Sequence, residues 1–258
     1  MLKIENVTKV FNLTGNIEDK RIALNDISIE IEDGEFVTVV GGNGSGKSTL
    51  MNIISGAYQP DHGKIYIDNI DVTGEKEYKR AKYLGRVFQD PMMGTASNMS
   101  IIENLELAIR RGKRRGLKWG FKKENENMFK SILSDLNLGL EDRLNQKVGL
   151  LSGGQRQAVT LLMATLEKPK VLLLDEHTAA LDPKTANSVL ELTNKIVNEN
   201  NLTTLMITHN MRDAIKYGNR LIMMYNGKVV LDVKKEEKEK LTVEFLLNKF
   251  NEMSEVEL

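Results

Sequence analysis

The stretch Phe36–Ser55, FVTVVGGNGSGKSTLMNIIS, decides how this 258-residue chain folds. It opens with the short apolar run Phe36 to Val40, which is typical of a buried strand. The residues Gly41 to Ser48 match the pattern G-x-x-x-x-G-K-[ST], and a segment with helical character follows to Ser55. Glycines let successive backbone amides curl around an anion in front of a helix N-terminus, so this strand–loop–helix unit predicts a phosphate-binding loop. The alternative is a flexible Gly/Ser loop, which the flanking strand and helix disfavour.

Two residues of this loop carry specific chemistry. Lys47 is expected to reach the β- and γ-phosphates of a nucleotide, and Ser48 to ligate Mg²⁺. A second element, Val171 to Glu176, is an apolar strand that ends in two carboxylates at the carboxyl edge of a parallel sheet. Asp175 suits the Mg²⁺ shell, and Glu176 could accept a proton from an attacking water. An acidic pair alone usually marks a strand end, but beside a phosphate loop it indicates phosphoryl transfer.

The third element is Leu151-Ser152-Gly153-Gly154-Gln155, which precedes an apparent helix. A hydroxyl, glycine amides and a helix N-terminus can together bind a second anion. A Ser/Gly linker between domains is the other interpretation of the same residues.

Hydrophobic periodicity predicts the remaining elements. The chain begins with strands and turns, becomes helical between residues 98 and 150, and then alternates helix and strand, which predicts a mainly parallel sheet. Residues 234–240 are expected to form a solvated linker before a last short helix at 242–250. The expected strands are 2–11, 27–31, 36–40, 171–174 and 203–208, with one hairpin at 64–73 that turns near Asp68-Asn69 and another around Asn226-Gly227. The expected helices include 48–55, 155–167 and 183–198, the last with Asp182 as its N-cap and Pro183 as its first residue.

Composition excludes several classes of protein. There is no cysteine, which excludes disulfides, thiolate nucleophiles and Cys-based metal sites. The 36 basic and 36 acidic side chains balance, which argues against a strongly basic nucleic-acid binder. The N-terminus lacks the apolar core of a signal peptide, and no apolar stretch approaches the roughly 20 residues of a membrane span.

Together these motifs resemble the nucleotide-binding subunits of ATP-binding-cassette (ABC) transporters, over essentially the whole chain. The resemblance implies an α/β P-loop NTPase with a RecA-like, mainly parallel sheet, an N-terminal antiparallel β subdomain and a helical subdomain. A single ABC ATPase domain would span residues 1–258. Its catalytic core with the β subdomain would comprise residues 1–90 and 156–258, and its helical subdomain, with the signature motif at Leu151 to Gln155, residues 91–155.

The resemblance also assigns roles to single residues. Glu176, His209, Gln89 and Lys47 are the implied catalytic residues, and Ser48, Gln89 and Asp175 the implied Mg²⁺ ligands. Phe11 would stack on adenine, although it could be an ordinary strand residue, while Gln89 could be a polar loop residue and His209 a capping side chain. The implied ATP-binding residues are Phe11, Gly41, Gly42, Asn43, Gly44, Ser45, Gly46, Lys47, Ser48 and Thr49, and from a partner copy Ser152, Gly153, Gly154 and Gln155. His62 is expected at the surface, and His177 receives no role.

The implied activity is hydrolysis of ATP with Mg²⁺, coupled to transport. Two copies would dimerise head to tail around ATP and power an integral membrane permease, with a solute-binding protein as indirect partner and no nucleic acid. The protein would then lie on the cytoplasmic face of a bacterial membrane. The runs 85–95 and 175–186 resemble a bacterial subgroup linked with uptake of aromatic amino acids such as tryptophan or tyrosine. A soluble ABC ATPase, such as the type that serves iron–sulfur assembly, is the alternative.

Two segments keep more than one interpretation. Pro91, Met92 and Met93 follow Gln89 and could form a surface for a membrane partner or pack in a core. The segment 110–123 carries eight basic residues around Trp119 and could be a solvated face, a contact with lipid headgroups or a permease, or a nucleic-acid contact.

Overall fold

A computed structural model describes residues 1–12, 20–113 and 123–255 of the chain. These residues form two compact units, Met1–Arg80 with Asn201–Leu258, and Ala81–Asn200. No helix in the described residues is long and apolar enough to cross a bilayer. The expected division into a catalytic core of residues 1–90 and 156–258 and a helical subdomain of residues 91–155 stays a prediction.

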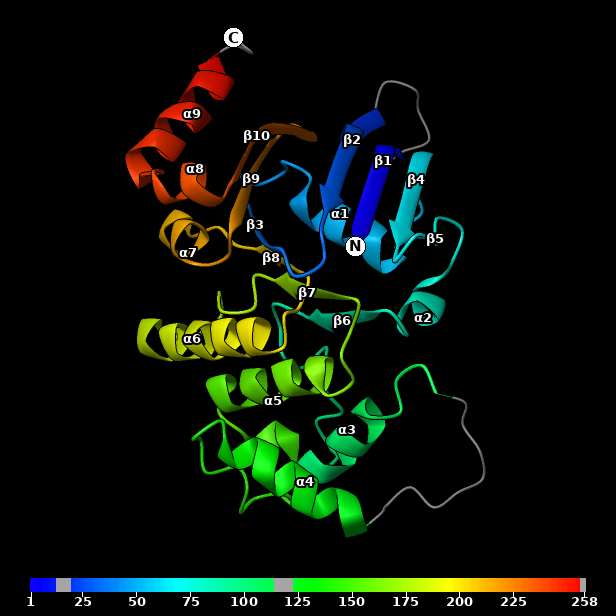
Figure 1. The fold of residues 1–258 in the computed structure, drawn as a ribbon, viewed down its shortest axis with the longest axis vertical. Helices are drawn as coiled ribbons and strands as arrows, with labels where there is room; N and C mark the ends of the chain where they lie inside the picture. Colours follow the sequence, from blue (N-terminus) through cyan, green and yellow to red (C-terminus); the bar gives the residue numbers. More distant parts are fainter. Residues whose placement is uncertain (13–19, 114–122, 256–258) are drawn as a thin grey trace. The chain divides into compact units, whose positions relative to one another are not determined.

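The first unit contains an antiparallel sheet and a group of mainly parallel strands (Figure 1). The antiparallel sheet has the order β2-β1-β4-β5, and β4 turns into β5 through Asp68 and Asn69, where the hairpin was expected to turn; both residues adopt positive φ. The strands of this sheet are β1 Leu2–Asn12, β2 Lys20–Ile31, β4 His62–Ile67 and β5 Ile70–Asp71.

The second group of strands in this unit has the order β10-β9-β3-β8, with β3 parallel to both β8 and β9. Every residue of β3 and β8 is buried, which explains their continuous apolar character. These strands are β3 Phe36–Val40, β8 Thr204–Ile207, β9 Arg220–Tyr225 and β10 Lys228–Lys234. The helices of the unit are α1 Lys47–Ser55, α2 Glu77–Arg80, α7 Met211–Lys216, α8 Lys235–Glu239 and α9 Val243–Glu255.

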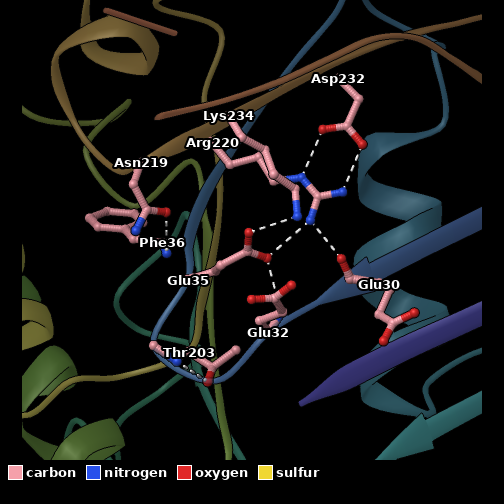
Figure 2. A network of polar contacts seen from close by, with 10 residues as sticks. Glu30, Glu32, Glu35, Phe36, Thr203, Asn219, Arg220, Asp232 and Lys234 are labelled. Carbon is pink, nitrogen blue, oxygen red and sulfur yellow. Dashed lines mark hydrogen bonds and ion pairs between the residues drawn. The ribbon is translucent and has the colours of Figure 1, made fainter. Parts of the chain in front are cut away.

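A polar network centred on Arg220 anchors the start of β3, the strand that leads into the glycine-rich loop (Figure 2). The guanidinium of Arg220 forms ion pairs with Asp232 at 2.7 Å and with Glu35 at 3.0 Å, and donates to the carbonyl of Glu30. Burial acts to raise the pKa of Glu35, but the Glu32 amide, Lys234 and Arg220 together lower it. The network therefore holds an ionised carboxylate next to the first residue of β3.

Residues 234–240 differ from the structure expected from the sequence. They were expected to form a solvated linker, and this prediction was wrong: residues 235–239 form α8, and the Lys238 side chain is only 2% exposed. Its ammonium donates to the carbonyls of Ile215, Tyr217 and Gly218, at the C-terminal end of α7. Burial lowers the pKa of Lys238 to about 8. The long apolar stem of lysine allows this capping, which a charge-rich sequence does not reveal.

The second unit packs helices around its own apolar core and contains two parallel strands. Ile101, Leu105, Phe129 and Leu133 are fully buried between α3, α4 and α5. The strands are β6 Leu84–Val87 and β7 Val171–Asp175, and the helices are α3 Ile101–Ala108, α4 Lys123–Ser134, α5 Gly153–Thr165 and α6 Pro183–Glu199, with a 3₁₀ turn at Val148–Leu150. Asp182 caps α6 and Pro183 opens it, as the sequence predicts.

Candidate nucleotide-binding and hydrolysis site

The loop between β3 and α1 has a backbone that only its glycines allow. Gly41, Gly44 and Gly46 have φ values of +155°, +81° and +102°. A Cβ on Gly46 would lie 2.5 Å from the carbonyl oxygen of Ala23, and one on Gly41 would collide with the carbonyl oxygen of Met224. The sequence pattern therefore corresponds to a tightly curled loop in front of a helix N-terminus.

Lys47 places its ammonium inside this curl. The side chain is 7% exposed, and its Nζ donates to the carbonyls of Gly41 at 2.7 Å and Gly42 at 3.0 Å. Ser48, the next residue, is exposed in the first turn of α1. The cation and the hydroxyl that phosphate and Mg²⁺ chemistry require are thus adjacent at this helix start.

His209 lies at the same end of the parallel strands as the glycine-rich loop. Val39 in β3 pairs with Ile207 in β8, and the amide of Thr208 donates to the carbonyl of Val39. Gly41 and His209 each follow these paired residues by two positions. The N-cap residue of α7 is Asn210, whose side chain accepts from the amides of Arg212 and Asp213, and not His209.

Phe11 stands near the end of β1 and belongs to an aromatic pair. Its ring lies 5.4 Å from the ring of Tyr58, edge to face, and Lys9 Nζ lies 5.6 Å from the Phe11 ring centre. Asp61 holds Lys9 through an ion pair of 3.0 Å. A half-buried aromatic ring with this support can stack on a base. Neither Tyr58 nor Lys9 stands in any motif, so sequence analysis could not find them.

In the second unit, the acidic pair and Gln89 follow neighbouring parallel strands. Val87 in β6 pairs with Leu174 in β7, so Gln89 and Glu176 each lie two residues beyond a paired position. Asp175 is 17% exposed and its carboxylate accepts from Arg86 Nη2 at 3.3 Å. Arg86 thus partly neutralises Asp175, a contact that the sequence did not predict because Arg86, although it lies in the run 85–95, was given no role.

Glu176 has a strained backbone. Its φ is +44°, in the left-handed region that a non-glycine residue rarely adopts. The carbonyl of Glu176 accepts from the amide of Ala179 at 2.9 Å, which closes a tight turn directly after β7. Such strain costs about 1–3 kcal/mol and is concentrated at functional sites, where it aims a side chain that relaxed geometry would direct elsewhere.

The segment Leu151 to Gln155 forms the start of α5. The Ser152 hydroxyl accepts from the amide of Gln155 at 3.3 Å, and the Gln155 side chain accepts from the amide of Ser152 at 3.2 Å. This is a capping box at the start of a helix, so the interpretation of these residues as a Ser/Gly linker between domains was wrong. A cavity of about 410 Å³ adjoins these residues and is also lined by Thr185 and Ser188 of α6.

The described part of the segment 110–123 has a structural role. Arg111 donates to the carbonyls of Ala164 and Glu167 at the end of α5, and Lys113 pairs with Glu167 at 2.5 Å. Residues 114–122 lie outside the described residues. Met92 and Met93 are 40% and 70% exposed, so core packing does not explain Met93 and the docking interpretation stays a prediction.

His177 is buried and neutral, as a structural residue should be. Its side chain is 2% exposed and its Nε2 lies 3.0 Å from Thr193 Oγ1. Because that hydroxyl donates to the carbonyl of Val189, it accepts from Nε2–H of His177. Burial lowers the pKa of His177 to about 4. His62, by contrast, is exposed, as expected.

The lowered pKa of His177 predicts an acid-dependent loss of stability. The unfolded chain binds the proton below about pH 6.5 and the folded chain only near pH 4, so the free energy of unfolding falls as the pH falls through this window. Between pH 7 and pH 5, protonation of His177 in the unfolded chain should lower the free energy of unfolding by about 2 kcal/mol. In His177→Leu this contribution to the pH dependence should be absent. Urea titrations at both pH values measure it, with exposed His62→Gln as the control that retains the full loss. An equal loss in His177→Leu would contradict the prediction.

Comparison with known proteins assigns the family. The family described as ABC transporter matches residues 24–179. The chain is 52% identical to the "Tyrosine transport ATP-binding protein" of Clostridioides difficile, over 97% of this chain and 98% of that one. It is 34% identical to "Methionine import ATP-binding protein MetN 1" of Oceanobacillus iheyensis, over 95% of this chain and 71% of that relative. A solved dimeric cassette, MJ0796 bound to ADP and Pi, has 33% identity and a TM-score of 0.75, covering 91% of this chain and 98% of that one.

The chain therefore belongs to the ABC transporter family. It is a nucleotide-binding, ATP-hydrolysing cassette of a transporter, which confirms the function and enzyme class that the motifs predicted. The α/β P-loop NTPase fold, with its antiparallel sheet and mainly parallel strands, is confirmed as well. The roles of single residues stay predictions.

Proposed function

We propose that this chain powers the import of an aromatic amino acid, tyrosine foremost, through a membrane permease. The observation that supports this most is the 52% identity, over nearly the full length of both chains, to a tyrosine transport ATP-binding protein. The methionine import relatives are less similar and longer than the matched region, which favours tyrosine over methionine. The chain then acts at the cytoplasmic face of the membrane, bound to its permease.

In the proposed reaction, ATP and water give ADP and phosphate. Glu176 accepts a proton from the attacking water, and the strained turn after β7 orients its carboxylate for this task. Lys47 exchanges its carbonyl partners Gly41 and Gly42 for phosphate oxygens and neutralises their charge. His209 and Gln89 contribute hydrogen bonds near the γ-phosphate, while Phe11 stacks on adenine. No covalent enzyme intermediate is required.

The donor set fits Mg²⁺. Among the described residues, no group of three or more His, Asp or Glu side chains could hold a metal ion by itself. Mg²⁺ typically binds through one or two carboxylates together with water and substrate phosphates, so it does not need such a group. Ser48, Gln89 and Asp175 offer oxygen ligands of this kind, and Mg²⁺ held by them would supply charge neutralisation at the phosphates.

We further propose that two copies bind ATP head to tail, with Ser152, Gly153, Gly154 and Gln155 of one copy completing the site of the other. The MJ0796 cassette is a dimer, which supports self-association. Ser152 and Gly153 are exposed at the start of α5, where backbone amides and the helix dipole favour an anion. Gly154 permits this placement because a Cβ there would collide with Thr185.

An uptake experiment tests the transport proposal. A bacterial strain that lacks the chromosomal gene for this protein receives the wild-type chain, Glu176→Gln, or the matched control Glu199→Gln. Glu199 is an exposed carboxylate at the end of α6. We expect the wild type and Glu199→Gln to restore uptake of labelled tyrosine, and Glu176→Gln to abolish it.

Mild-detergent purification of the tagged chain should also recover a polytopic permease and a solute-binding protein. Restored methionine uptake without tyrosine uptake would replace the proposed substrate. Recovery with only soluble partners would favour the soluble type of ABC ATPase instead.

A further inference from the structure

Arg21 is an exposed cation at the glycine-rich loop that no motif includes. It is the second residue of β2, and its Nη2 lies 2.7 Å from the position that a Cβ on Gly44 would occupy. Since Gly44 has no side chain, the guanidinium rests directly against the backbone of the loop. Within the described part of the chain Arg21 forms no hydrogen bond or ion pair, whereas Arg80, Arg86, Arg111 and Arg220 all do.

The register of the antiparallel sheet places Arg21 beside Phe11. Residues Phe11 and Arg21 are direct partners between β1 and β2, so their side chains project from the same face of the sheet. The guanidinium therefore bridges from the aromatic residue expected to stack on adenine to the loop expected to bind phosphates. A nucleotide that contacts both Phe11 and Gly44 would therefore lie close to Arg21.

We propose that Arg21 is an additional nucleotide-binding residue that contacts the α- or β-phosphate, which ATP and ADP share. The inference rests on the proposed phosphate loop at Gly41 to Ser48. A guanidinium presents several N–H donors in one plane and forms charge-assisted hydrogen bonds to phosphate oxygens. Without a competing carboxylate, Arg21 does not have to give up an ion pair in order to bind.

Gly44 lies where the turn of the loop and the guanidinium of Arg21 meet. Gly44 has a φ of +81°, and a side chain at this position would displace the guanidinium as well as strain the turn. The positive φ is what requires glycine here, and the missing side chain leaves room for the guanidinium.

Nucleotide titrations of purified full-length variants test the proposal. Arg21→Ala should weaken the binding of both ATP and ADP about 10-fold in low salt, because one charge-assisted contact is lost. The loss should shrink at high ionic strength, which screens an exposed cation. Arg21→Lys should recover part of the affinity. The matched control is Lys20→Ala, which removes an equal charge from the adjacent exposed residue on the opposite face of β2 and should bind as wild type.

A comparison of ATP with GTP separates a phosphate contact from a base contact. Arg21→Ala should weaken both nucleotides by the same factor, whereas a loss confined to ATP would overturn the phosphate assignment. Lys47→Ala distinguishes a failure of the role proposed for Arg21 from a failure of the proposed phosphate loop. If the wild type binds ATP, Lys47→Ala does not and Arg21→Ala matches the wild type, only the role of Arg21 fails. If Lys47→Ala binds ATP as tightly as the wild type, the proposed phosphate loop itself fails.

Discussion

Glu176→Gln should reduce ATP hydrolysis by about 100-fold or more while leaving ATP binding intact. A positioned general base contributes about 10²–10⁴-fold to a rate, and the amide cannot accept the proton of the attacking water. The substitution keeps the size of the side chain and does not alter the left-handed backbone at this position. Phosphate release measures turnover, and equilibrium binding of labelled ATP measures affinity.

A second readout follows from the proposed head-to-tail dimer. Because Glu176→Gln binds ATP and does not consume it, the variant should accumulate as a dimer in ATP, whereas the wild type should return to its nucleotide-free mass as ATP is used. Light scattering with and without ATP measures this difference. The control Glu199→Gln should hydrolyse ATP as the wild type does. Turnover of Glu176→Gln close to the wild-type rate would contradict its role as the base.

Arg80→Leu should lower the free energy of unfolding by about 3–5 kcal/mol, because the buried guanidinium donates several hydrogen bonds and each one that involves a charged group typically contributes about 1.5–3 kcal/mol. Arg80 is fully buried, and its guanidinium donates to the carbonyls of Ile53, Ile54, Thr73 and Glu75 at 2.6–3.0 Å. Leucine would remove a charged donor from all four carbonyls, although Ile53 also accepts from the amide of Gly56 and Glu75 from the side chain of Gln59. Urea denaturation measures the change as a lower midpoint with an unchanged slope.

The matched control for Arg80 is its neighbour Lys79, which is exposed on the same short helix α2. Lys79→Met removes an equal charge and should change stability by less than about 0.5 kcal/mol, as surface substitutions usually do. Arg80→Lys retains the charge but reaches fewer acceptors, so it should fall between Arg80→Leu and the wild type. A midpoint for Arg80→Leu equal to that of Lys79→Met would show that the carbonyls find other donors.

The sequence predicts most of this fold because its signals are local. The run before Gly41, the turn at Asp68-Asn69 and the pair Asp182-Pro183 each specify a nearby backbone conformation, and each is found where expected. The glycine pattern likewise specifies a loop of known shape. These features depend on neighbours in the chain, and a single sequence contains them in full.

The contacts that sequence analysis missed join distant residues. Lys238 caps α7 from more than twenty residues away, and its charged neighbours suggest only a solvated segment. Arg21 gains its significance from Gly44, which approaches it only after β2 and the loop are folded. A buried polar side chain is recognised by its partners, and no periodicity or motif in one sequence reports partners that lie far apart in the chain.

Arg80 and the glycine-rich loop contact opposite ends of α1, so the stability of the fold and the affinity for nucleotide depend on different ends of this helix. The helix has nine residues and is therefore about 13 Å long. Its C-terminal carbonyls accept from a buried cation, while its N-terminus faces the loop, and each terminal electrostatic effect fades within about one turn. Thermal robustness and nucleotide affinity can therefore be engineered independently in this cassette, the first at one end of a single helix and the second at the other.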